Sequence, residues 1–142
     1  MSKLKVIFLS VLFSSLFILS CGDNKPKNLT PATPAVVVSP YDIDASPENI
    51  EKGKLLYQTN CSPCHGATGH GDGPAAAALN PKPRNHSDST YMNKLTNEHL
   101  ITLLKNGGAA KGFPLMPAFS QMKDEEIKQT IAFVRTLANP KK

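Results

Sequence analysis

The sequence predicts an all-α domain in which three or four helices are connected by long loops. Three segments carry apolar residues at helical spacing, and no segment shows the two-residue alternation that indicates a half-buried strand. Between the helices, residues 66–94 and 107–123 are rich in Gly, Pro and Ala and are long for loops of a compact domain. A chain of 142 residues fits one such domain.

The first helix is predicted from a start signal and one continuous face. Ser46 offers an N-cap side chain, and Pro47 suits the first helical position. Ile50, Gly53 and Tyr57 then fall on the same face of the helix. This helix is expected to lead directly into the cysteine motif that follows it.

Two further helices are predicted in the second half of the domain. One starts at Thr96 and ends at Gly107, because glycine suits the end of a helix. The other starts near Asp124, where a run of acidic residues favours a helix N-terminus electrostatically. The apolar stripe of this last helix is expected to consist of Ile127, Ile131, Val134 and Ala138.

The N-terminal residues predict export and attachment to a membrane. Residues 1–20 combine early lysines with a short apolar run, which is the pattern of a signal peptide. The run from Ile18 to Gly22 resembles the lipobox of bacterial lipoproteins, so we expect Cys21 to be lipidated. An ordinary secretory signal with a chance cysteine is the alternative. Residues 21–45 carry four prolines among small and polar residues and are expected to form a tether, with residues 46–139 as the folded domain.

The positive charge of the chain lies outside the predicted domain. The formal net charge is +5, but residues 41–139 contain ten Lys and Arg and ten Asp and Glu. Nucleic-acid binding requires a basic face on the domain itself. The composition therefore gives no support to that class of function.

Residues 61–65, Cys-Ser-Pro-Cys-His, form a C-x-x-C-H motif, the attachment signature of c-type haem. Two thiols at this spacing reach the two vinyl groups of one haem, and the next residue is carried to the iron as its proximal ligand. We predict one covalent haem c bound through Cys61 and Cys64, with His65 on the iron. A domain with six aromatic residues after its signal also needs a large apolar group to complete its core.

Three other interpretations of the cysteine pair explain less of the sequence. A thioredoxin-like dithiol usually follows a strand, and no strand is predicted here. A zinc site needs four ligands, and no second cysteine pair is present. A structural disulfide is possible in an exported protein, but it leaves His65 and the long loops unexplained.

Met116 is the expected second iron ligand. Pro114 and Pro117 bracket it, and Pro117 holds Met116 away from helical geometry, which stiffens the loop. Met122 and Met92 are the rival candidates, and a loop methionine that fills a gap in the core is the structural alternative. The remaining histidines are expected to be exposed and not to bind iron: His70, His86 and His99.

From residue 46 to residue 138, the order of parts resembles the class I, single-haem cytochrome c family. The parts are a helix, C-x-x-C-H, a Gly-rich loop, a middle helix, a Met-Pro loop and a C-terminal helix. The resemblance implies a cytochrome c fold, with three to four helices around one haem and the first and last helices crossing at Gly53. It also implies that the carbonyl of Pro74 accepts a hydrogen bond from the free ring nitrogen of His65 and so orients the ring.

The chain departs from the family pattern in two places. Lys123 stands where a capping Ser, Thr or Asp is common, so the last helix is expected to begin late or to fray. No tryptophan is present to bind a haem propionate. That role is left to Arg84, Lys82 or a backbone amide.

These features predict a single-electron carrier, anchored to a membrane on the periplasmic or outer side and serving a respiratory or related redox chain. Its expected partners are a donor and an acceptor protein, with a membrane respiratory complex as one of them. Enzyme activity is not expected, because two protein ligands on the iron keep substrates from it. A peroxidase-like enzyme and a haem sensor with a displaceable Met116 are the alternatives.

Overall fold

The computed structural model describes residues 39–140. The predicted signal peptide (residues 1–20), the predicted lipidation site Cys21 and the predicted tether as far as residue 38 lie outside the described residues. Between residues 39 and 140 the chain forms helices and loops and no strand. The predicted all-α fold class is therefore confirmed.

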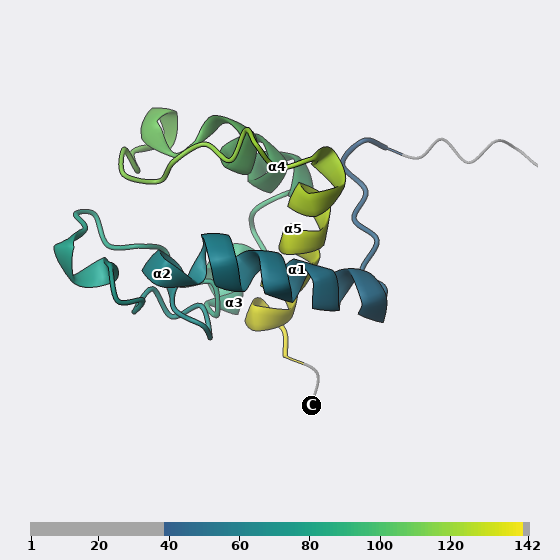
Figure 1. Ribbon diagram of the computed structural model, residues 1–142, viewed down its shortest axis with the longest axis horizontal. Helices are drawn as coiled ribbons and strands as arrows, with labels where there is room; N and C mark the ends of the chain where they lie inside the picture. The colour runs from purple at the N-terminus through teal and green to yellow at the C-terminus, as the bar shows by residue number, and fades with distance from the viewer. Residues whose placement is uncertain (1–38, 141–142) are drawn as a thin grey trace, which may run out of the picture. The chain divides into compact units, whose positions relative to one another are not determined.

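Five α-helices and two short 3₁₀ turns make up the described part of the chain (Figure 1). In chain order they are α1 (Pro47–Asn60), α2 (Ser62–His65), η1 (Ala76–Ala78), α3 (Ser89–Met92), α4 (Asn97–Asn106), η2 (Ala109–Lys111) and α5 (Asp124–Ala138). The three long helices are those that the sequence predicts. Of the short elements, η1, α3 and η2 fall in segments expected to be loops, and α2 lies within the C-x-x-C-H motif. A single turn carries too little periodicity to be recognised from the sequence.

Side-chain caps fix the starts of α1 and α4 where the sequence predicts them. The hydroxyl of Ser46 accepts a hydrogen bond from the backbone N–H of Asn49 at 3.4 Å. The hydroxyl of Thr96 accepts one from the backbone N–H of His99 at 3.1 Å. Each cap satisfies one of the N–H groups that have no partner inside the helix.

The helix α5 begins at Asp124, so the expectation of a late start is wrong. The carboxylate of Glu126 accepts a hydrogen bond from the backbone N–H of Lys123 at 2.7 Å. This is the contact that the third helical residue makes in a capping box. Lys105 of α4 also pairs with Asp124 at 2.7 Å. The first turn of α5 is thus held without a Ser or Thr cap.

The crossing of α1 and α5 at Gly53 agrees with the expectation from the family resemblance (Figure 1). A Cβ atom at Gly53 would overlap the backbone carbonyl oxygen of Gln129 in α5. Beside the crossing, the rings of Tyr57 and Phe133 pack with centroids 5.2 Å apart. The missing side chain at Gly53 is therefore what lets the two backbones touch.

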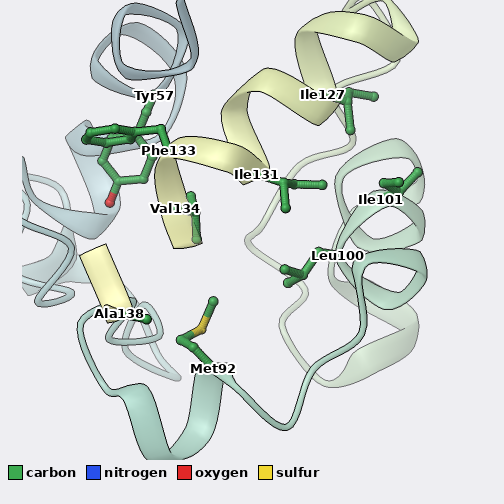
Figure 2. Close-up of a cluster of buried hydrophobic side chains, with 9 residues drawn as sticks. All are labelled: Tyr57, Met92, Leu100, Ile101, Ile127, Ile131, Phe133, Val134 and Ala138. Carbon is green, nitrogen blue, oxygen red and sulfur yellow. The ribbon is translucent and has the colours of Figure 1, made fainter. Parts of the chain in front are cut away.

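One hydrophobic core joins α1, α3, α4 and α5, and α5 contributes most of it (Figure 2). All four residues of the predicted α5 stripe are buried. The full set of core residues is Tyr57, Met92, Leu100, Ile101, Ile127, Ile131, Phe133, Val134 and Ala138.

Arg135 ties α5 to the segment that joins α3 and α4. Its guanidinium donates to the backbone carbonyls of Met92 and Leu95, each at 2.7 Å, and to the side-chain oxygen of Asn97 at 3.0 Å. The carbonyls at the end of α3 are thereby satisfied by a charged donor. This contact fixes one wall of the site described below.

Two residues at the end of the predicted tether, Ile43 and Asp44, contact the domain. Ile43 is partly buried on the core, and the carboxylate of Asp44 accepts hydrogen bonds from the backbone of Ser46 and the side chain of Asn49, each at 2.9 Å. The packed part of the chain thus extends a few residues before residue 46. No helix within residues 39–140 combines the length and hydropathy needed to cross a membrane.

Candidate functional site

The C-x-x-C-H motif forms a single helical turn at the end of α1. The backbone N–H groups of Cys64 and His65 both donate to the carbonyl of Cys61, at 3.1 and 2.9 Å. Residues three and four apart lie on one face of a helix. The turn therefore presents both thiols and the imidazole on the same side, and all three side chains border one cavity.

That cavity has a volume of about 380 Å³, which is within the range of sites that hold a cofactor-sized ligand. The motif contributes one part of its wall, and α4 with the segment after η2 contributes another. Most of the lining is aliphatic or aromatic, including Leu79, Leu95, Leu103, Leu104, Phe113 and Ile131. It is an apolar slot with few polar groups, as an apolar macrocycle requires.

Met116 borders the same cavity from the loop that follows η2. Its backbone carbonyl accepts a hydrogen bond from Gly108 at 2.9 Å, and its own N–H donates to Phe113 at 3.0 Å. Just beyond it, the N–H of Phe119 donates to the carbonyl of Leu104 in α4 at 2.8 Å. The loop is therefore fastened at Met116 to the segment just after α4 and at Phe119 to α4 itself.

The rival methionines lie in different surroundings. Met92 also touches the cavity, but it is only 1% exposed and forms part of the core below Val134 (Figure 2). Met122 packs against the core and does not line the cavity. Of the two methionines that line the cavity, Met92 belongs to the helix α3 and Met116 lies in a loop.

The ring nitrogen Nδ1 of His65 lies 2.9 Å from the backbone carbonyl of Arg84. The prediction that Pro74 supplies this carbonyl is therefore corrected. The backbone N–H groups on either side of Pro74, at Gly73 and Ala75, donate to the carbonyls of Cys64 and Pro63 in the motif. Pro74 itself is exposed.

The chain returns to the His65 ring at Pro83 and Arg84. A Cβ atom at Gly71 would collide with the Pro83 carbonyl, so glycine at 71, with its φ of 78°, allows this approach. The sequence carries no local signal for this contact, because it joins residues 19 positions apart.

His86 was expected to be exposed, and that expectation is wrong, because the ring is partly buried. Its ring stacks on the ring of His65 with centroids 4.0 Å apart and planes 17° apart. Its Nδ1 also lies 3.3 Å from the hydroxyl of Tyr57. His70, in contrast, is exposed, and His99 is half-buried at the cavity wall.

Burial keeps both stacked imidazoles in their neutral form. It lowers the pKa of His65, and it lowers the pKa of His86 to about 3, with the nearby His65 acting in the same direction. A neutral imidazole is the form that binds a metal ion.

The surroundings of Cys61 do not favour thiol–disulfide chemistry. Burial, helped by the neighbouring Cys64, raises the pKa of Cys61 to about 12. Cysteines that attack disulfides have lowered pKa values instead. The thioredoxin-like alternative also expected a strand before the motif, whereas α1 precedes it.

The charged residues around the cavity are all basic: Lys82, Arg84 and Lys111. The Lys82 ammonium donates to the carbonyls of Ala76 and Ala77 at 2.9 and 2.8 Å, so it is engaged in holding η1. The Arg84 guanidinium lies over the ring of Tyr91, 4.1 Å from its centre. Of the two basic candidates for a propionate, Arg84 therefore keeps its hydrogen-bond donors available.

A sequence model of the family described as cytochrome c matches residues 50–138 of the chain. The match covers α1 from residue 50 onward, the C-x-x-C-H turn, the residues that line the cavity and α5. The chain belongs to the cytochrome c family. This cytochrome accordingly carries a covalent haem c, and the position of Cys61 and Cys64 on one apolar cavity fits that group.

Two curated proteins are similar in sequence to this chain, each over less than half of its own length. The cytochrome is 28% identical over 117 residues to the cbb3-type cytochrome c oxidase subunit FixP of Rhizobium meliloti, covering 82% of this chain and 37% of the relative. It is 34% identical over 106 residues to the quinohemoprotein alcohol dehydrogenase ADH IIB of Pseudomonas putida, covering 73% of this chain and 13% of the relative. The chain thus corresponds to a minor part of each of these proteins.

Proposed function

We propose that this cytochrome is a single-electron carrier whose haem iron is held by His65 and Met116. The observation that carries the proposal is that both side chains border the same apolar cavity, one from the C-x-x-C-H turn and one from the Met-Pro loop. A histidine and a methionine on the iron raise its reduction potential relative to two nitrogen ligands. With both positions filled, substrates do not reach the metal.

The bound haem supplies the change between ferric and ferrous iron. The chain supplies the rest. Cys61 and Cys64 anchor the group, and the Arg84 carbonyl accepts the Nδ1 proton of His65 and so directs Nε2 toward the cavity. The hydrogen bonds of Gly108 and Phe113 hold the Met116 backbone in place, and the apolar lining excludes water.

The function is tested by an optical redox titration of the haem-loaded protein. We expect a single reversible one-electron transition and no spectral change when carbon monoxide is added to the ferrous form. Rapid binding of carbon monoxide, or turnover of peroxide by the ferric form, would support the sensor or peroxidase alternatives instead. The fastening of the Met116 loop to α4 supports the electron carrier over these alternatives.

The proposed setting is a membrane surface. Export by residues 1–20 and lipidation at Cys21 would hold the domain at a membrane on the predicted tether that follows Cys21, facing the periplasm or the cell exterior. The oxidase relative supports a respiratory complex as a redox partner, and the basic residues around the cavity suit an acidic surface on that partner. Cys21→Ala is expected to move the cytochrome from the membrane fraction to the soluble fraction. A wild-type protein whose measured mass includes no lipid would refute the anchor.

A further inference from the structure

We infer that His86 is a positioning residue that fixes the orientation of the His65 ring beside the haem. The inference rests on the proposed function, in which His65 binds the iron. It concerns a different property: which way the ring plane of that ligand points, and which side chain sets it.

A single hydrogen bond does not determine that orientation. The contact between Nδ1 of His65 and the Arg84 carbonyl fixes one direction in the ring. The last side-chain torsion of histidine is broad, so the ring can still tilt about that direction at small cost. A second contact on the flat face of the ring is needed to stop the tilt.

The ring of His86 provides that contact. The two rings are stacked nearly parallel, with an angle of 17° between their planes and their centroids 4.0 Å apart. Because this is close to van der Waals separation, a tilt of either ring would bring its atoms into the other.

Two contacts hold His86 itself in place, one at its backbone and one at its ring, so its ring can restrain that of His65. Its backbone N–H donates to the carbonyl of Gly69, and its Nδ1 lies 3.3 Å from the hydroxyl of Tyr57. A Cβ atom at Gly69 would crowd the Cβ atom of His86, so the glycine allows the close approach.

Tyr57 connects the ring of His86 to the crossing of α1 and α5. It is completely buried, its hydroxyl donates to the carbonyl of Gly66 at 3.1 Å, and its ring packs on Phe133. Because the phenol has one proton to give, Nδ1 of neutral His86 is the donor in the contact between them, a tautomer assigned from the hydrogen-bond network. Tyr57 thus joins the His86 ring to the packing of α1 on α5, while the restraint on His65 comes from the stacked ring itself.

The test compares two substitutions at position 86 in the haem-loaded protein. His86→Phe keeps a flat ring and loses the hydrogen bond, whereas His86→Leu keeps apolar bulk and loses the flat face. The readout is the spread of the haem methyl signals in the proton NMR spectrum of the ferric protein, which depends on the planes of the axial ligands. His70→Ala, at an exposed histidine of the neighbouring loop, is the matched control.

We expect the wild-type spread in His86→Phe and in the control, and an altered spread in His86→Leu. A wild-type spread in His86→Leu would overturn the inference, as would an equal change in both variants. Failure of the proposed function is a separate result, because wild-type protein would then lack the signals of an iron-bound histidine and methionine.

Discussion

Among single residues, Cys61 and Cys64 have the most sharply defined role, since each is expected to form one thioether. Cys61→Ser or Cys64→Ser alone should leave one covalent bond and one free vinyl group. We expect the pyridine haemochrome band of either variant to move to longer wavelength, with haem still attached in denaturant. The double variant should release its haem into acidified organic solvent. Haem that stays attached in the double variant would contradict the assignment.

The residues that surround His65 show where sequence reasoning stops. The motif and Met116 were visible because their chemistry is tied to a short local pattern. The Arg84 carbonyl and the His86 ring were not, because each reaches His65 through the return of a loop from some 20 positions away. A backbone carbonyl leaves no mark on the residue type that carries it, so the sequence has no signal that favours Arg84 over the Pro74 that the family resemblance implies.

At the level of helices, the α1–α5 crossing makes a specific demand on Gly53. Gly53→Ala would improve helix propensity by about 1 kcal/mol. The added methyl group, however, would overlap the Gln129 carbonyl and force the helices apart, which costs about 1–3 kcal/mol net of this gain. Urea unfolding of the haem-loaded protein measures the difference, with Gln58→Ala on the exposed face of α1 as control. Unchanged or increased stability would show that the crossing tolerates a side chain.

A second prediction at this level concerns Arg135 and the joint between α3 and α4. Arg135→Met keeps the length of the side chain and removes the donors to Met92 and Leu95. Hydrogen bonds from a charged group to such carbonyls contribute roughly 1.5–3 kcal/mol, so we expect a loss of about 2–3 kcal/mol in unfolding free energy. Lys94→Met, at an exposed position of the same joint, should change it little. Equal effects of the two substitutions would contradict this account.

The helices themselves were largely predictable, and their connections were not. Start signals at Ser46 and Thr96, together with the α5 stripe, place three helices correctly. The turns α2, α3, η1 and η2 depend on how the loops wrap around the cavity. Their short sequences have no periodicity from which to predict them.

For the whole molecule, the haem is expected to be part of the core and not an addition to it. Without the haem, the apolar side chains that line a cavity of about 380 Å³ would lose their packing partner, and each large apolar side chain left exposed forfeits roughly 1.5–3 kcal/mol. A few such side chains amount to much of the whole stability of a domain, about 5–15 kcal/mol. Chain produced without haem attachment should therefore lose most of its helical circular dichroism and its cooperative urea transition. A cooperative transition close to that of the haem-loaded protein would show that the helices close without the cofactor.

The near-infrared spectrum of the ferric protein tests the central claim most directly, because methionine bound to ferric haem gives a charge-transfer band there. The account predicts that the band is present in the wild type, is kept in Met122→Ala and Met92→Leu, and is lost in Met116→Ala. A band that survives Met116→Ala, or that disappears only when Met122 or Met92 is replaced, would contradict it.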